Sequence, residues 1–315
     1  MTIDRRACAF IFPGQGSQFL GMGQDLANWH PAAMRTFEEA DSILGFPFSQ
    51  IMWSGSVHDL NCTINTQPAV FIHSIAVIQV LKDTVPDLQP VCLAGHSLGE
   101  LSALATIESF SFEDGIRLVR KRAELMEFAG TIAPGGMAAI IGLEIADVAE
   151  LCSQITDGGK LLQIANDNCP GQVVVSGTRD AIEEVVVAAK TAGARRVIPL
   201  AVSIAAHSEL MSVIQADFGG FLDDTPMVDA SIPVISNVSA EPMTSSESLR
   251  DDLRAQLVKQ VRWSETIRRM IETDGIDTFV EIGPGSVLTG LLKRIAPNAK
   301  GISIGSPADI EAAFR

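Results

Sequence analysis

The sequence predicts an α/β fold on a mainly parallel sheet, with a smaller domain inserted into it. Short apolar runs alternate with segments of helical periodicity along most of the 315 residues. Glycine-rich turns directly follow several of these runs. The middle of the chain has its own order of strand, helix, strand, strand, helix and strand, which is typical of a split βαβ unit.

The first part of the chain supplies two strands and three helices. Ala7–Phe12 is an apolar run that ends at a glycine-rich turn, and Val91–Ala94 is a second one. Apolar residues at helical spacing predict helices over Ala32–Leu44, Pro68–Lys82 and Gly99–Thr106. Strands separated by helices of this length pair in parallel.

The middle segment predicts a small domain of its own. In chain order we expect strand Met137–Leu143, helix Ala146–Gln154, strand Leu161–Asn166, strand Gln172–Ser176, helix Arg179–Thr191 and strand Arg196–Val202. This order predicts a ferredoxin-like subdomain at residues 132–200. The larger domain then comprises residues 1–131 and 201–315.

The larger domain resumes after the insertion. Ser231–Ser236 and Thr278–Ile282 are expected strands, and Leu249–Thr273 is expected to be helical. The turn Gly283-Pro284-Gly285 follows the last of these strands. A short helix, Ser208–Met211, is expected just after the insertion.

Composition argues against several classes of protein. The 23 basic and 38 acidic residues give a net charge of −15, whereas nucleic-acid binders need Lys and Arg for phosphate contacts. The five cysteines form no C-x-x-C pair, which favours reduced thiols in the cytoplasm. The longest apolar segment, Ala69–Leu81, is too short and polar for a membrane span, and the N-terminal run is too short for a signal peptide. No metal-ligand spacing is present.

The sharpest chemical signal is Gly95-His96-Ser97-Leu98-Gly99, a G-x-S-x-G nucleophile elbow between an apolar run and a helix. Its glycines allow a turn tight enough to expose the Ser97 hydroxyl. The helix N-terminus makes the backbone N–H of Leu98 a donor for an oxyanion. The alternative is a chance Gly-Ser-Gly turn at a strand–helix junction.

A second glycine-rich segment, Phe12–Gln18, follows the first expected strand. It does not fit a dinucleotide-binding loop, since Phe19 stands where that loop needs glycine, and no Gly-Lys-Ser/Thr follows. It can instead present the backbone N–H of Gln15 to an oxyanion. A plain turn is the alternative.

A serine hydroxyl needs a base, and His207 is the best-placed of the five histidines, late in the chain after an expected strand. His96 lies inside the elbow and is expected to point away from Ser97. The others are expected on surface turns or helices: His30, His58 and His73. For the group that orients the base, Asp167, Asp180 and a carbonyl all remain open.

A basic helix, Leu118–Met126, is the third signal. Arg120 and Lys121 are expected on a solvated face. An arginine of this helix turned inward toward the serine would bind a carboxylate on the acyl group through a two-pronged hydrogen bond.

Taken together, these segments resemble the malonyl-CoA:acyl-carrier-protein transacylases, the acyltransferases of fatty-acid and polyketide synthesis. The resemblance covers nearly the whole chain. Besides the elbow and the Phe12–Gln18 segment, it rests on Thr66–Ala69, Asn166–Val174, Val202–Ser208 and Glu281–Gly285.

The resemblance implies an α/β-hydrolase-like core with an inserted ferredoxin-like subdomain. It also implies roles at single positions. Ser97 matches the acylated nucleophile, His207 its base, and Arg122 the residue that binds the malonyl carboxylate. The remaining matches are the oxyanion donors Gln15 and Leu98, the histidine-orienting carbonyl of Gln256, and the acyl-pocket residues Gln67, Asn166, Met126 and Ala206.

The implied reaction is ping-pong, with malonyl-CoA as substrate, no bound cofactor and an acyl carrier protein as transient partner. Family members are often monomers. Carrier proteins are acidic, so docking to this acidic chain needs a basic patch, for which Lys190, Arg195 and Arg196 are the candidates.

Other functions stay open. A serine hydrolase or acyl-thioesterase uses the same elbow with water as the second nucleophile, and a carrier-binding scaffold keeps the fold without catalysis. Ala206 stands where relatives often have Phe or Ser, which allows α-substituted malonyl groups. A free-standing polyketide acyltransferase and the relative that serves malonate decarboxylase are the alternatives within the family.

Overall fold

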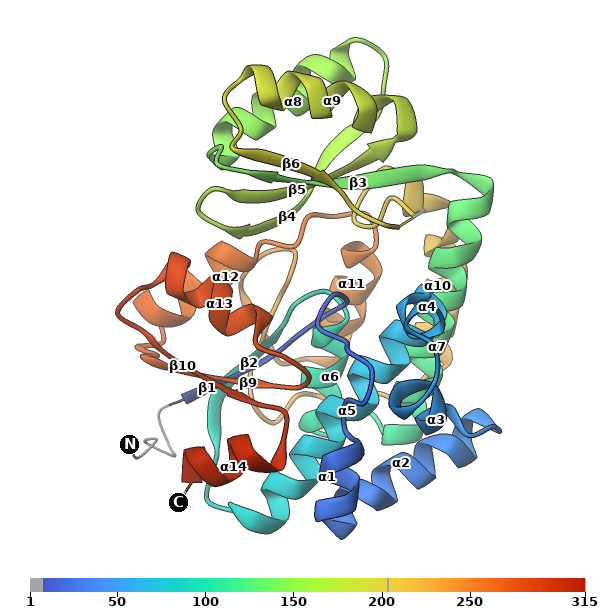
Figure 1. The fold of residues 1–315 in the computed structure, drawn as a ribbon, viewed down its shortest axis with the longest axis vertical. Helices are drawn as coiled ribbons and strands as arrows, with labels where there is room; N and C mark the ends of the chain where they lie inside the picture. The colour runs from blue at the N-terminus through green and yellow to red at the C-terminus, as the bar shows by residue number, and fades with distance from the viewer. Residues whose placement is uncertain (1–7, 203, 315) are drawn as a thin grey trace.

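Two sheets organise the chain, and the computed structural model describes residues 8–202 and 204–314. Figure 1 shows the smaller sheet and its helices at one end of the molecule, above the larger sheet. Ala7, predicted to begin the first strand, and Ser203, in the segment before His207, lie outside the described residues.

The larger sheet has six strands in the order β10-β9-β1-β2-β7-β8. Its neighbours pair in parallel except β7 with β8, which confirms the predicted mainly parallel sheet. The strands are β1 (Cys8–Phe12), β2 (Pro90–Gly95), β7 (Val234–Ile235), β8 (Pro242–Met243), β9 (Thr278–Ile282) and β10 (Lys300–Ile304).

Both faces of this sheet are buried, as β1 shows. Cys8, Phe10 and Phe12 belong to one hydrophobic cluster, which includes α5 (Thr63–Thr84) and α6 (Gly99–Thr106). Ala9 and Ile11 point to the other face, against α12 (Trp263–Glu272) and α13 (Val287–Ile295). A parallel strand covered on both sides is expected to be apolar throughout, and this one is.

The larger domain contains further helices. These are α1 (Gln24–Trp29), α2 (Pro31–Leu44), α3 (Phe48–Trp53), α4 (Val57–Asn61), α7 (Phe112–Ile132), the 3₁₀ helix η1 (Glu209–Ile214), α10 (Gln215–Asp224), α11 (Ser246–Gln256) and α14 (Pro307–Phe314). Helix α5 begins at Thr63, not at the expected Pro68, so the view that this segment is too short for a membrane span is wrong. Among the described residues α5 alone is long and apolar enough for a span, but 83% of its apolar window is buried inside the protein.

The smaller sheet has the order β4-β5-β3-β6, and all its neighbours are antiparallel. Its elements are β3 (Gly135–Ile141), α8 (Ile145–Asp157), β4 (Leu162–Cys169), β5 (Gln172–Thr178), α9 (Arg179–Thr191) and β6 (Arg196–Pro199). They share a separate hydrophobic cluster. This order is the predicted ferredoxin-like one, and we propose that the subdomain spans residues 132–200, inserted between residues 1–131 and 201–315.

The helices expected over Leu249–Thr273 are found as α11 and α12, with a break between them. The break lies at Val261, whose backbone N–H donates to the carbonyl of Ala165, 2.8 Å away. The N–H of Asp167 donates back to the carbonyl of Val261 at 3.0 Å. Pairing of this loop with β4 replaces helical hydrogen bonds, a tertiary effect that helical periodicity does not reveal.

The turn between β2 and α6 depends on two glycines. A Cβ atom on Gly95 would lie 1.9 Å from the carbonyl carbon of Gly99, and one on Gly99 would lie 2.1 Å from the carbonyl oxygen of Phe12. All the atoms met are backbone, which has little freedom to move away. The elbow therefore requires glycine at both positions.

We predict that Gly95→Ala lowers the free energy of unfolding by about 3 kcal/mol or more, because its methyl group overlaps fixed backbone. Gly220→Ala in α10 is the matched control, since its methyl group meets nothing within 4 Å. Alanine there should raise stability by about 0.5–1 kcal/mol. Urea denaturation measures both, and equal effects of the two substitutions would contradict the packing argument.

Candidate active site

Ser97 lies at the tip of the elbow in a left-handed conformation, with φ 53°. A non-glycine residue with positive φ is strained, and the side chain of Asn237 holds it in place. Asn237 Oδ1 accepts from the Ser97 backbone N–H at 2.8 Å, and its Nδ2 donates to the Gly95 carbonyl at 2.7 Å. Asn237 is not among the residues predicted from the sequence, although it follows the expected strand Ser231–Ser236 at the edge where parallel strands end.

His207 is brought to Ser97 across the inserted domain. The Ser97 Oγ and His207 Nε2 atoms are 2.8 Å apart, and His207 Nδ1 is 2.7 Å from the backbone carbonyl of Gln256. Because a carbonyl can only accept, the proton belongs on Nδ1, which leaves the Nε2 lone pair facing Ser97. Of the three options left open for orienting the base, the structure has the carbonyl; Asp180, by contrast, pairs with Lys160.

Burial keeps His207 neutral. Its side chain is enclosed, and desolvation, followed by the positive charge of Arg122, lowers the pKa of His207 to about 3. The hydrogen bond to the Gln256 carbonyl opposes this shift only in part. The imidazole is therefore unprotonated, and able to accept a proton, throughout the physiological range.

Arg122 points inward from α7 and is 2% exposed. Its Nη2 donates to Ser97 Oγ at 3.0 Å and to Gln256 Oε1 at 2.9 Å, and its Nη1 donates to Gln67 Oε1 at 2.7 Å. Burial lowers the pKa of Arg122 to about 10, so it remains charged at neutral pH. These three acceptors are uncharged, and among the described residues Arg122 forms no salt bridge.

The other basic residues of this helix face outward as predicted. Arg120 is partly exposed and pairs with Glu124 at 3.0 Å, and Lys121 is half-buried. One helix therefore carries both a solvated basic face and one enclosed guanidinium.

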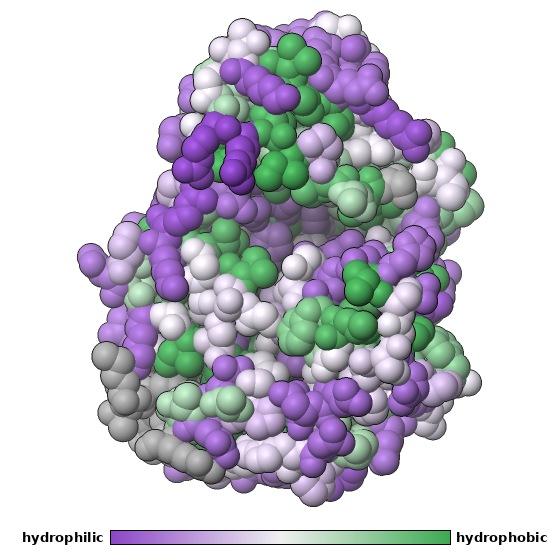
Figure 2. All heavy atoms as spheres, viewed as in Figure 1, coloured by the Kyte–Doolittle hydropathy of each residue, from purple (hydrophilic) through white to green (hydrophobic). Residues whose placement is uncertain are grey.

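A cavity of about 130 Å³ encloses the reacting groups. Figure 2 shows the surface hollowed between the lobe with the smaller sheet and the main body. The predicted residues that line the cavity are Gln15, Gln67, Ser97, Leu98, Arg122, Met126, Asn166, Ala206 and His207. Met137, Leu200, Val202 and Ile204 add an apolar wall.

Two backbone amides at this cavity are available to a ligand. Within residues 8–202 and 204–314, the N–H groups of Gln15 and Leu98 have no hydrogen-bond partner. Leu98 directly precedes α6, where the helix dipole favours negative charge. The pair lies on two loops, after β1 and after β2, whose strands are neighbours in the sheet.

The remaining predicted residues differ in where they lie. His96 also lines the cavity, but its ring packs on Trp263, with 5.5 Å between centroids, and its Nε2 is 2.8 Å from Asn168 Oδ1. His73, expected on the surface, is fully buried in α5, because that helix is enclosed on nearly all sides. Gln256 contributes its side chain to Arg122 as well as its backbone carbonyl to His207.

The three residues considered for carrier docking are all exposed, and none forms a salt bridge with another described residue. Lys190 is in the last turn of α9. Arg196 pairs with Ile141 at the start of β6, at the opposite end of the strand from Leu200 of the cavity wall. They lie on the smaller lobe, away from the serine.

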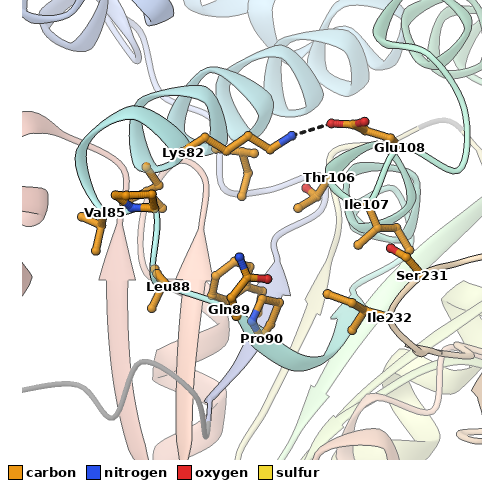
Figure 3. A pocket seen from close by; sticks show the side chains of 14 residues that line it. Lys82, Val85, Leu88, Gln89, Pro90, Thr106, Ile107, Glu108, Ser231 and Ile232 are labelled. Carbon is orange, nitrogen blue, oxygen red and sulfur yellow. Dashed lines mark hydrogen bonds and ion pairs between the residues drawn. The ribbon is translucent and has the colours of Figure 1, made fainter.

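A larger cavity of about 360 Å³ lies at the opposite edge of the main sheet, around Pro90 at the start of β2 (Figure 3). Lys82 and Glu108 form an ion pair of 2.7 Å there. Its lining includes no predicted site residue. Ligands of open α/β sheets bind at the carboxyl ends of the strands, which is the edge that carries Ser97.

No group of three or more His, Cys, Asp or Glu side chains is placed to hold a metal ion in the part of the chain that the structure describes. Ser97, His207 and Arg122 and the amides of Gln15 and Leu98 meet at the cavity. These groups supply a nucleophile, a neutral base, a fixed positive charge and two oxyanion donors.

The fold and this arrangement define a class, the α/β enzymes of acyl transfer. Within it, the chain belongs to the acyl transferase domain family, whose profile matches residues 9–304. The chain is 44% identical to the malonyl CoA-acyl carrier protein transacylase of Bacillus subtilis (strain 168), over 98% of this chain and 96% of the relative.

Solved structures agree with this assignment. An acyl carrier protein S-malonyltransferase from Vibrio cholerae is 40% identical, with a TM-score of 0.92 over 97% of this chain and 99% of that one. A malonyl-transacylase solved in complex with its type II PKS acyl-carrier protein is 38% identical, with a TM-score of 0.94 and 98% of both chains covered.

We predict that Ser97 stays reactive in mild acid. Labelling by a fluorophosphonate probe should change by less than about twofold between about pH 8 and pH 5, since His207 with a pKa of about 3 remains neutral. A histidine of ordinary pKa would lose about thirtyfold in rate at pH 5. Circular dichroism at each pH checks that the fold persists, and a rate that halves near pH 6.5 would contradict the prediction.

Proposed function

We propose that the protein transfers a malonyl group from malonyl-CoA to the phosphopantetheine thiol of an acyl carrier protein. The observation that carries the proposal is the guanidinium of Arg122, charged, enclosed and 3.0 Å from Ser97 Oγ, with only neutral partners. A buried cation without an ion-pair partner is costly. An acyl group that brings its own carboxylate supplies that partner.

In the first half-reaction Ser97 Oγ attacks the thioester carbonyl while His207 Nε2 takes its proton. The tetrahedral oxyanion lies between the amides of Gln15 and Leu98. The C–S bond then breaks, His207 returns the proton to the sulfur of coenzyme A, and malonyl-Ser97 remains. Removing one such oxyanion donor typically slows catalysis about 10²–10³-fold.

In the second half-reaction the carrier thiol gives its proton to His207 and attacks the malonyl-Ser97 ester. The same amides hold the second oxyanion. Collapse breaks the ester C–O bond, and His207 returns the proton to Ser97 Oγ. Because Nδ1 stays bonded to the Gln256 carbonyl at 2.7 Å, the imidazole keeps its tautomer between the two halves.

Transfer is favoured over hydrolysis by the apolar wall of the cavity. Met126, Met137 and Leu200 offer few hydrogen-bonding groups that could hold a water molecule near the ester. Ala206 also faces this space. Its small methyl group supports a second candidate activity on α-substituted malonyl groups, as in polyketide synthesis.

The composition of the chain also bears on where the protein acts and what it binds. We infer that it acts in the cytoplasm, as a monomer, without nucleic-acid or membrane partners and without a bound cofactor. The free thiols of Cys62, Cys92, Cys152 and Cys169, the last three of them buried, support a reducing compartment. Its net charge of −15 disfavours anionic polymers.

Following the malonyl group from malonyl-CoA to its final acceptor tests the proposed transfer reaction. With malonyl-CoA alone, we predict one rapid release of coenzyme A per Ser97, followed by slow turnover. Adding holo carrier protein should restore rapid release and give malonyl-carrier, which mass spectrometry detects. Ser97→Ala should abolish both phases, and Ser102→Ala, in the helix α6 that follows Ser97, is the control. Rapid release of free malonate without carrier would instead identify a hydrolase.

We propose that Lys190, Arg195 and Arg196 bind the acidic carrier. Their exposure and lack of salt-bridge partners support this, because rim charges steer association between proteins. Attraction at this patch would offset repulsion from the negative net charge.

Charge reversal tests the patch. The double variant Arg195→Glu/Arg196→Glu should raise the KM for carrier protein about tenfold at low salt and leave the KM for malonyl-CoA unchanged. Arg35→Glu is the control, because Arg35 is exposed on α2 at the far end of the molecule (Figure 1). An unchanged carrier KM would remove these residues from the docking surface.

A further inference from the structure

Beneath Arg122 lies a pair of buried carboxyl groups that the reaction above does not use. Glu100, in the first turn of α6, is 0% exposed, and Asp252 of α11 is 8% exposed. Gln256, four residues after Asp252 on the same face of α11, donates to Glu100, so the two carboxyl groups are neighbours, and Asp252 raises the pKa of Glu100. Two carboxylates in contact repel each other, so a hydrogen bond between them needs a proton.

The partners of the four carboxyl oxygens show where that proton belongs. Glu100 Oε2 accepts from Gln256 Nε2, and Asp252 Oδ1 accepts from Ser236 Oγ. The other two oxygens, Glu100 Oε1 and Asp252 Oδ2, are buried and have no hydrogen-bond partner among the described residues. A proton between these two oxygens satisfies both atoms at once.

We propose that Glu100 and Asp252 share one proton, and that this pair is a positioning unit which fixes the Gln256 amide and, through it, the guanidinium of Arg122. The inference rests on the proposed function, because it concerns how the malonyl-binding arginine is held. Burial and the neighbouring Asp252 both raise the pKa of Glu100, while Gln256 and Arg122 lower it less.

The Gln256 amide can satisfy its neighbours in only one orientation. Nε2 donates to Glu100 Oε2 and, at 3.1 Å, to the Ser97 carbonyl, while Oε1 accepts from Arg122 Nη2 at 2.9 Å. A flipped amide would set its oxygen against two acceptors and its NH₂ against the guanidinium. Glu100 therefore determines which end of Gln256 meets Arg122.

The shared proton also sets the charge of the site. With it, the pair carries one negative charge, which offsets the charge of Arg122 only in part, so that the guanidinium still attracts the malonyl carboxylate. Without the shared proton, Glu100 and Asp252 would carry two negative charges next to the single positive charge of Arg122, and these charges would repel the malonyl carboxylate. The shared proton thus preserves selection for a carboxylate-bearing acyl group.

Infrared spectroscopy of the substrate-free protein tests the proton directly. We expect a carbonyl band of an un-ionised carboxylic acid at neutral pH in the wild type, absent in Glu100→Gln and present in the control Asp251→Asn, which alters the exposed neighbour of Asp252. Absence of the band from the wild type would overturn the inference. Because no substrate is present, this result is independent of whether the proposed function holds.

Kinetics test the positioning. Glu100→Ala should lower kcat/KM for malonyl-CoA about ten- to a hundredfold, the cost of a misplaced charge-assisted hydrogen bond, with little change for acetyl-CoA. Glu100→Gln keeps an acceptor for Gln256 and a donor for Asp252, so it should recover most of that loss. As the pH is raised into the alkaline range, the KM of the Glu100→Gln variant for malonyl-CoA should increase less than the KM of the wild type. Equal losses for both acyl groups, or superimposable pH profiles, would overturn the positioning role.

Discussion

The site is organised around one enclosed positive charge. Arg122 is 2% exposed, and its guanidinium contacts Ser97, Gln67 and Gln256 directly. Burying an arginine is costly unless its N–H groups are hydrogen-bonded and its charge is balanced. The two glutamine oxygens and the Ser97 hydroxyl meet the first requirement. In our proposal the Glu100–Asp252 pair meets the second only in part, and the malonyl carboxylate completes it. Burial, and after it the charge of Arg122, depress the pKa of His207 and so keep the base neutral.

The fold brings these groups together from distant parts of the chain. Ser97 follows β2, Gln15 follows β1, and Asn237 follows β7, so all three lie where parallel strands end. The inserted subdomain closes the cavity through Met137 and Asn166, and the chain returns from it at Leu200 and His207. Helix α11 then places Asp252 and Gln256 on one face, four residues apart. The loops at the ends of the parallel strands therefore hold Ser97 in position. Helices α7 and α11 supply the groups that select an acyl group with a negative charge.

Much of this could be predicted from local signals. The strand–turn–helix around Ser97 and the strand and helix order of the insertion have short-range signatures, and the structure confirms the α/β class and both sheets. The inward turn of Arg122 followed from resemblance, because its neighbours Arg120 and Lys121 are solvated on the same helix. Asn237, the Glu100–Asp252 contact and the break at Val261 depend on pairing between remote segments, and single-sequence periodicity contains no record of them. The prediction that His73 lies on the surface was wrong because α5 is enclosed on nearly all sides, so a polar residue in this helix does not indicate an exposed face.

Selection of the acyl group by Arg122 is tested most directly by competition. Brief incubation with equimolar malonyl-CoA and acetyl-CoA, followed by intact-mass measurement, reports which acyl group reaches Ser97. On the wild type, the malonyl adduct should exceed the acetyl adduct at least about tenfold, which corresponds to the free energy of one charge-assisted hydrogen bond. Arg122→Ala should lose that preference, whereas Arg120→Ala, on the solvated face of the same helix, should keep it. Equal malonyl and acetyl adducts on the wild type would contradict selection by the buried guanidinium.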